Sequence, residues 1–267
     1  MSVRVHDSIT KLGSEDEGTV AIAASHGGVY SGYLAAKGKL RGVVFSDAGV
    51  GLERAGLGSL AYLDALGMPA ATVDYRSARI GDGADLARRG TISFCNESAR
   101  RLGCAAGETA RACAEKMLAA HEYRGDAPAY AEARTLLLER PRAPNVWGLD
   151  SVSLVRDGDA GAIVLTGSHG GLLGGVPASA LRIDALAAAY NDAGVGIDDA
   201  GISRLPALQE RGIAAVTVAA DSARIGDAKS AWETGRVSHA NAVAREYGAR
   251  EGMTLPAFVE WVLRAVG

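Results

Sequence analysis

The chain has 267 residues, of which 48% are hydrophobic, so it can form one large or two small globular domains and is neither disordered nor fibrous. The formal net charge of −3 excludes a strongly basic surface, and we expect neither nucleic acid nor an anionic membrane as a partner. No apolar run approaches the roughly 20 residues that span a bilayer, and no secretory hydrophobic region is present. We therefore expect a cytoplasmic protein whose partner is a small molecule.

An internal duplication organises the chain. Residues 7–28 match residues 150–171, and residues 47–82 match residues 192–227 with 19 identities in 36 ungapped positions. Each copy is about 110 residues long, which is the size of a domain rather than of a solenoid repeat. We therefore predict two similar lobes related by a pseudo-twofold axis, as in a fused homodimer that could associate further into a homo-oligomer.

The predicted boundaries are a first lobe over residues 1–120, a helical connector over residues 121–146 and a second lobe over residues 147–267. The connector contains a helix-like stretch at residues 130–138, which Pro141 and Pro144 would end.

Each copy alternates predicted strands and helices in chain order. Residues 19–24 and 162–166 are continuous apolar runs that are typical of strands buried on both faces. A second strand is expected at residues 42–45, but its counterpart, residues 185–190, is rich in alanine and equally compatible with a helix. This alternation predicts an α/β fold with two Rossmann-like lobes and largely parallel sheets, in which ligands bind beyond the carboxyl ends of the strands.

A third strand is expected at residues 70–74 and 214–219, each after a helix that ends at Gly67 or Gly212. The strongest repeated motifs directly follow the three strands of each copy. They are Ser-His-Gly-Gly, Asp-Ala-Gly-Val-Gly and Ser-Ala-Arg-Ile-Gly-Asp. These motifs should converge on one edge of each sheet.

The first motif offers acid–base chemistry. His26 and His169 stand at predicted strand ends, where an imidazole can act as a general acid or base near neutral pH. The glycines that follow would let a ligand approach the backbone: Gly27, Gly28, Gly170 and Gly171. The alternative is a histidine that only bonds a neighbouring loop.

Ser25 and Ser168 precede the histidines in a pattern that loosely resembles the nucleophile elbow of serine hydrolases, although the first glycine of that elbow is missing. A catalytic triad would need a distal histidine, and the later ones are His121 and His239. A serine hydroxyl that orients the loop or the substrate is therefore favoured over a nucleophile.

The second motif opens with Asp47 or Asp192. Either carboxylate could cap a helix, accept a proton or, with a histidine, hold a divalent metal, but the spacing is not diagnostic of a metal site. The glycines of this motif match neither the dinucleotide-binding nor the P-loop pattern. We predict no cofactor.

The third motif carries Ser77 and Arg79 in the first copy, and Ser222 and Arg224 in the second. A guanidinium on a strand-end loop suits the capture of a carboxylate or phosphate. The alternative is an internal pair between each arginine and the aspartate three residues later, which could instead start the next helix.

Asn96 and Asn241 are predicted on a helix whose apolar stripe begins at Ile92 in the first copy. A buried asparagine must be hydrogen bonded, so it could latch a loop, pair across the lobe interface or contact the substrate.

The cysteines do not recur in the second copy. Cys95, Cys104 and Cys113 are nine residues apart, which on one helix would place successive thiols on opposite faces. No CxxC pair is present, so we expect neither a disulfide framework nor a structural zinc site.

These residues predict an enzyme that acts on a small, polar, anionic metabolite, first of all a hydrolase of an amide or imide. In this interpretation histidine moves protons, aspartate orients it and arginine holds the anion. A lyase or isomerase needs almost the same groups, and the rival from another class is a non-catalytic binding or sensing protein. Residues 74–76 and 219–221 differ between the copies, which favours a single or composite site over two equivalent ones.

Overall fold

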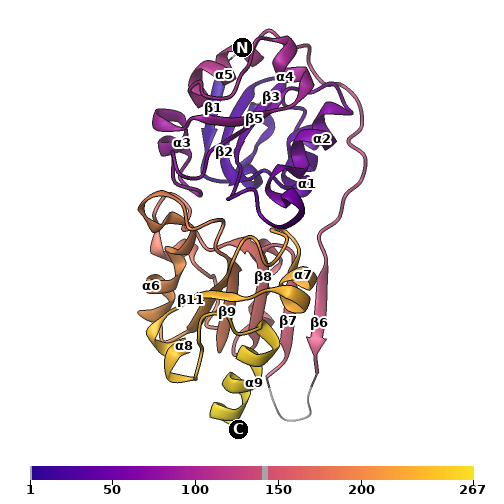
Figure 1. Cartoon of the computed structure of the whole chain (residues 1–267). Helices are drawn as coiled ribbons and strands as arrows, with labels where there is room; N and C mark the ends of the chain where they lie inside the picture. The colour runs from indigo at the N-terminus through magenta and orange to yellow at the C-terminus, as the bar shows by residue number, and fades with distance from the viewer. Residues whose placement is uncertain (1, 140–143) are drawn as a thin grey trace.

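The computed structural model describes residues 2–139 and 144–267. Two sheets, each with its own helices, form two bodies that lie one above the other in Figure 1. We call the sheet of strands β1–β5 with its helices the N-terminal half, and the sheet of strands β6–β11 with its helices the C-terminal half. Both sheets are mixed and mostly parallel, which confirms the α/β class.

The N-terminal sheet has the order β1-β2-β3-β4-β5, in which only β5 is antiparallel to its neighbour. Its strands are β1 (Val3–His6), β2 (Val20–His26), β3 (Gly42–Ser46), β4 (Ala70–Val73) and β5 (Ile92–Cys95). Its helices are α1 (Val29–Lys37), α2 (Gly58–Asp64), α3 (Gly83–Arg89), α4 (Glu97–Arg101) and α5 (Ala110–Met117).

The C-terminal sheet has the order β11-β10-β9-β8-β7-β6, with β6 and β11 antiparallel at its two edges. Its strands are β6 (Arg134–Leu138), β7 (Val146–Leu149), β8 (Ile163–His169), β9 (Ala187–Asn191), β10 (Ala214–Val218) and β11 (Val237–Ala240). Its helices are α6 (Arg204–Gln209), α7 (Ala228–Thr234), α8 (Ala242–Glu246) and α9 (Leu255–Val266).

Alternate residues of each central strand pack into separate cores on the two faces of the sheet. In β2, Ile22 faces a core that includes Leu86 of α3, whereas Ala23 faces a core that includes Leu63 of α2. All of these side chains are buried. Burial on both faces explains why the strands read as continuous apolar runs, and it leaves their carboxyl ends as the polar edge of the sheet.

The strands and helix ends that the sequence predicts are largely confirmed. Residues 187–191, which were compatible with a helix, form strand β9. Gly67 and Gly212 end their helices with the same φ of +69°, a conformation that glycine adopts without steric cost. No helix within residues 2–139 and 144–267 is both long and apolar enough to span a bilayer.

Two predicted helices are wrong. The stretch expected to be helical in the connector instead contains the antiparallel edge strand β6, which pairs with β7; Pro141, one of its expected ends, lies outside the described residues. Ile92 and Cys95 belong to strand β5, and Asn96 caps the next helix. In both places pairing with an edge of a sheet, a tertiary contact, overrides the local helical pattern.

The loops that follow β3 and β9 join the two halves. An added Cβ on Gly49 would lie 2.9 Å from Cα of Gly194, and the same distance separates a Cβ on Gly194 from Cα of Gly49. Leu52 N–H donates to the Ala220 carbonyl at 2.8 Å, and Ile197 N–H donates to the Tyr75 carbonyl at 3.2 Å. These paired contacts bring the carboxyl ends of the two parallel sheets against each other.

Candidate functional site

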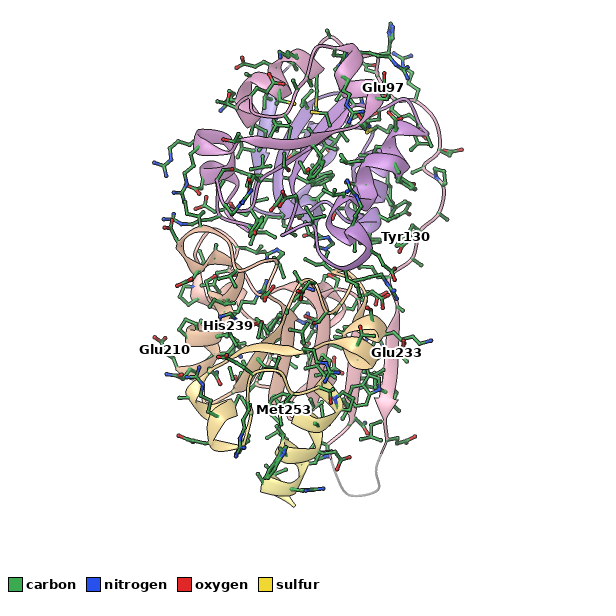
Figure 2. All side chains as sticks on the ribbon, viewed as in Figure 1. Glu97, Tyr130, Glu210, Glu233, His239 and Met253 are labelled. Carbon is green, nitrogen blue, oxygen red and sulfur yellow. The ribbon has the colours of Figure 1, made fainter. Side chains whose placement is uncertain are left out.

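A cavity of about 220 Å³ lies where the two halves meet. Both halves and the connector contribute to its lining, which includes Ser25, His26, Tyr30, Glu132, Ser168, His169 and Arg204. An adjacent cavity of about 250 Å³ shares His26, Tyr30 and Glu132 with it. Figure 2 labels Tyr130, another residue of the adjacent cavity, beside the junction of the halves. The candidate site is therefore composite.

Each histidine is the last residue of a central strand and reaches across to the other half. A Cβ on Gly226 would lie 3.3 Å from Cε1 of His26, and a Cβ on Gly81 would lie 3.4 Å from Cε1 of His169. The imidazole of His26 thus packs on the glycine loop that follows β10, and that of His169 packs on the glycine loop that follows β4. An added Cβ would be in tight contact with the ring, and both glycines also have a positive φ, +81° for Gly226 and +83° for Gly81, which glycine adopts without steric cost.

The hydrogen bonds of the two rings define their tautomer. Gly28 N–H donates to Nδ1 of His26, and Gly171 N–H donates to Nδ1 of His169, both at 3.1 Å. An Nδ1 atom that accepts a hydrogen bond carries no proton, so each neutral ring carries its proton on Nε2. Neither Nε2 atom has a hydrogen-bond partner within the described residues. Each ring can therefore donate to a ligand from Nε2.

Burial keeps both histidines neutral. It lowers the pKa of His26 to about 4. Burial also lowers the pKa of His169 well below its ordinary value, and the charges of Arg204 and of protonated His26 add to this effect. At neutral pH both imidazoles are therefore uncharged, with Nε2–H as the available hydrogen-bond donor.

We expect long-range ¹H–¹⁵N NMR spectra to show both imidazoles as neutral Nε2–H tautomers at pH 7. His26 should gain its second proton only near pH 4, because burial opposes the charged form. The His26→Gln and His169→Gln variants would assign the signals. An imidazolium signal from either ring at pH 7 would contradict this assignment of donors.

Glu132 is the titratable carboxyl group of the cavity. Its pKa is raised to about 7, first by burial and then by the nearby charge of Asp150, while hydrogen bonds from Tyr30 and Ser151 act in the opposite direction. A carboxyl group with a pKa close to the ambient pH can both take up and release a proton, which is what a general acid–base catalyst requires.

Arg204 brings a buried positive charge to the cavity. It is 1% exposed, and its guanidinium donates to the carbonyls of Gly171 at 2.9 Å, Ser179 at 2.7 Å and Ala180. The guanidinium also lies over the ring of Tyr190, 5.1 Å from its centre, but no carboxylate of the described residues lies within 4.0 Å of it. Because a buried charge is normally paired, this guanidinium favours an anionic group in the adjoining cavity.

Ser25 and Ser168 line the same cavity, but their hydroxyls accept hydrogen bonds from backbone N–H groups. The Ser25 hydroxyl accepts from Ile9 N–H, and the Ser168 hydroxyl accepts from Val152 N–H, both at 2.9 Å. No hydrogen bond joins either serine to a histidine among the described residues. This arrangement agrees with the orienting role that the sequence favours over a nucleophile.

The glycines after the histidines serve close packing. A Cβ on Gly27 would lie 2.5 Å from the Gly56 carbonyl oxygen, and a Cβ on Gly170 would lie 2.4 Å from that of Gly201. Their N–H groups donate within the protein, to carbonyls or to the histidine rings. These amides are not free to bind a ligand.

Asp47 and Asp192 lie at the junction but do not line the cavity. Oδ1 of Asp47 accepts from Gly49 N–H and Tyr75 N–H, and Oδ1 of Asp192 accepts from Gly194 N–H and Ala220 N–H. Each carboxylate therefore ties together the two loops that face the other half. Burial raises the pKa of Asp47 to about 6.

Arg79 and Arg224 already have carboxylate partners across the junction. Arg79 pairs with Asp198 at 2.8 Å, and Arg224 pairs with Glu53 at 3.1 Å. Arg224 also pairs with Asp227 within its own loop at 2.9 Å. These arginines hold the halves together at the rim of the site.

The remaining predicted residues lie outside the cavity lining. Ser77 and Ser222 each donate to the carbonyl three residues earlier and so stabilise the loops that follow β4 and β10. Asn96 accepts from Ala70 N–H and donates to the Met68 carbonyl, and Asn241 makes the matching bonds in its own half. Both asparagines latch a strand to a helix start, one of the roles that the sequence allows.

Sequence reasoning missed Glu132, Tyr30 and Arg204. Glu132 lies in the connector, where no motif marks it. Arg204 occupies the position of Ser59 in the alignment of the two copies, so a search for charged residues present in only one copy could have found it.

Comparisons with protein-family models, with curated proteins and with solved structures found no match to this chain.

Proposed function

We propose that this protein is an enzyme that removes a proton beside the carbonyl group of a small anionic metabolite. The supporting observation is that two neutral imidazole donors, a carboxyl group with a pKa of about 7 and a buried, unpaired guanidinium line one cavity. This set contains a base, an oxyanion site and an anchor for the anion, which are the groups that the reaction needs.

Each group has a role in the proposed reaction. The Arg204 guanidinium binds the carboxylate or phosphate of the substrate and thereby orients it. Nε2–H of His26 and of His169 donate to the carbonyl oxygen, where negative charge develops as the proton leaves. Glu132, as the carboxylate, takes the proton from the neighbouring carbon. Return of that proton to another carbon gives an isomerase, and departure of a substituent gives a lyase.

Hydrolysis of an amide or imide, which the sequence placed first, uses the same oxyanion site. It also requires an activated nucleophile, and the Ser25 and Ser168 hydroxyls accept from backbone N–H groups and have no hydrogen bond to a histidine within the described residues. Water activated by Glu132 is the remaining nucleophile. Proton transfer at carbon needs no additional group, so we favour it.

Solvent exchange separates these reactions. The protein is incubated in D₂O with small oxo acids, phosphorylated carbonyl compounds, amides and imides, and ¹H NMR follows each compound. We expect loss of the proton signal beside a carbonyl in at least one anionic compound. A hydrolysis product without exchange would favour the hydrolase, and binding seen by calorimetry without any turnover would favour a binding or sensing protein.

We expect Arg204→Gln to weaken binding of that anionic compound by roughly 30-fold to several thousand-fold. Removing one member of a buried charge pair costs about 2–5 kcal/mol. Arg211→Gln is the control, because Arg211 also donates to carbonyls, those of Leu181 and Ile183, but does not line the cavity. Equal affinity losses in the two variants would mean that Arg204 acts only by holding its loop.

We also infer that the two halves are Rossmann-like lobes that arose by duplication and are related by a pseudo-twofold axis. The support is the sequence match between the copies together with the paired contacts of Gly49 with Gly194 and of Leu52 and Ile197 at the junction. In this arrangement one composite site at the axis replaces two equivalent sites, and Glu132 and Arg204 make it asymmetric.

A further inference from the structure

The three cysteines of the chain converge within the core of the N-terminal half. Cys95 ends strand β5, Cys104 follows helix α4 and Cys113 lies in helix α5, and all three are buried. They therefore do not lie on one helix, and they are close together although the sequence has no CxxC pair. Tertiary packing brings together thiols that the sequence places nine residues apart.

A carboxylate completes the cluster. The ligand atoms of Cys104, Glu108 and Cys113 all lie within 4.8 Å of one another. The Cys104 thiol also donates to the Cys113 carbonyl at 3.6 Å. The Cys95 thiol lies near enough to the Cys113 thiol to raise its pKa, so Cys95 is the neighbouring side chain that could add a fourth donor. Ligand atoms of a tetrahedral zinc centre with Zn–S bonds of about 2.3 Å lie about 3.8 Å apart, and the ligand atoms of Cys104, Glu108 and Cys113 are at most 4.8 Å apart.

The C-terminal half has apolar side chains at the four aligned positions. Cys95, Cys104 and Cys113 align with Ala240, Ala249 and Phe258, and Glu108 aligns with Met253, which Figure 2 labels. Ala240, Ala249 and Phe258 are part of the main apolar core there, and Met253 packs against it. The same fold position is thus filled by an aromatic ring in one half and by three thiols and a carboxylate in the other.

The helix that covers this position also differs. Helix α9 has 12 residues and buries Phe258, Val259 and Val262, whereas α5 has 8 residues and presents Cys113, Ala114 and Met117 at the aligned positions. The N-terminal half therefore has less apolar bulk to hold its last helix. A metal ion bound by side chains from β5, from the loop after α4 and from α5 would supply the missing link.

The ligand chemistry selects the ion. Thiolates favour zinc, copper(I) and iron–sulfur clusters, and the added carboxylate oxygen favours the borderline ion Zn²⁺ over copper(I). Lys116 lies 2.5 Å from Oε2 of Glu108, so its positive charge offsets part of the negative charge that the deprotonated ligands would carry. Ala105 N–H holds the other carboxylate oxygen at 2.8 Å.

We propose that Cys104, Cys113, Glu108 and Cys95 form a structural zinc site in the N-terminal half. On binding, each ligating thiol releases its proton to solvent and forms a Zn–S bond, with no change of oxidation state. The site is independent of the reaction proposed above, because none of its residues lines the cavity at the junction.

The test measures zinc in protein that is purified under reducing conditions. Elemental analysis should give about one zinc per chain, and cobalt(II) added to the zinc-free protein should produce a thiolate-to-cobalt charge-transfer band. A strong chelator should lower the melting temperature by roughly 5–10 °C. Cys104→Ser/Cys113→Ser should abolish metal binding, while Ala249→Ser, the same polar change in the other half, should leave it unchanged.

A second variant tests the site if the serine variant does not fold. Replacing the four ligands by the residues of the other half, as Cys95→Ala/Cys104→Ala/Glu108→Met/Cys113→Phe, should give a folded protein that binds no zinc and whose melting temperature does not respond to the chelator. Three titratable thiols without bound zinc or cobalt would overturn the proposal in favour of a plain apolar core. A mass lower by two hydrogens, with one thiol left, would overturn it in favour of a disulfide.

Discussion

Glu132→Gln should lower kcat/KM for proton exchange by about 10²- to 10⁴-fold, the usual contribution of a general base. The amide keeps the size of the side chain and its neighbours, Tyr30 and Ser151, but it cannot accept a proton. The exchange assay in D₂O measures the loss directly. Glu122→Gln is the matched control, since Glu122 belongs to the same connector and pairs with Arg41 away from the cavity.

The pH profile provides a second readout for Glu132. Its pKa of about 7 means that the carboxylate form, which is the base, decreases as the pH falls below 7. Wild-type kcat/KM should therefore fall about tenfold for each pH unit below 7 and level off above it. Glu132→Gln should remove this dependence from the residual activity. If kcat/KM of the variant still falls below pH 7 as it does in the wild type, the base is another group.

Gly49→Ala should destabilise the protein by roughly 2–5 kcal/mol. Gly49 has a φ of +73°, which costs an L-residue about 1–2 kcal/mol. The new Cβ would also lie 2.9 Å from Cα of Gly194 in the opposite half, so the backbones at the junction must move apart. Thermal unfolding should show a melting temperature lower by roughly 5–15 °C.

Gly67→Ala separates the two causes. Gly67 has a φ of +69°, but no atom lies within 4 Å of its added Cβ. The free energy of unfolding of this variant should fall only by the conformational cost, roughly 1–2 kcal/mol. Equal melting temperatures for the two variants would mean that the approach of Gly49 to Gly194 contributes nothing to stability. Gly49→Ala should also reduce proton exchange, because the cavity is formed by both halves.

The sequence by itself determined the α/β class and the position of the histidines. A short continuous run such as residues 19–24 is typical of a strand that is buried on both faces of a sheet, and parallel strands place all of their carboxyl ends at one edge. His26 and His169 follow these runs directly, so their location at the polar edge could be predicted. The pattern was sufficient because the alternation of strands and helices along the chain makes the strands parallel.

The edge elements and the arginine roles could not be predicted in this way. Strands β5 and β6 form because an antiparallel partner is available at the edge of a sheet, and their sequences are also compatible with helices. The sequence allows the pairs that Arg79 and Arg224 make with the aspartate three residues later, but their other carboxylate partners, Asp198 and Glu53, come from the opposite half. These contacts join residues more than 100 positions apart, so no local sequence pattern could predict them.

Only the tertiary structure decided which groups share the candidate site. Glu132 owes its raised pKa to burial against elements that are distant in sequence, and the charge of Arg204 is unpaired only because the fold buries it beside a cavity. The thiols of Cys95, Cys104 and Cys113 also meet only after β5 and α5 have packed together. Sequence patterns report the period of a strand or a helix, whereas desolvation and the meeting of side chains depend on three-dimensional packing.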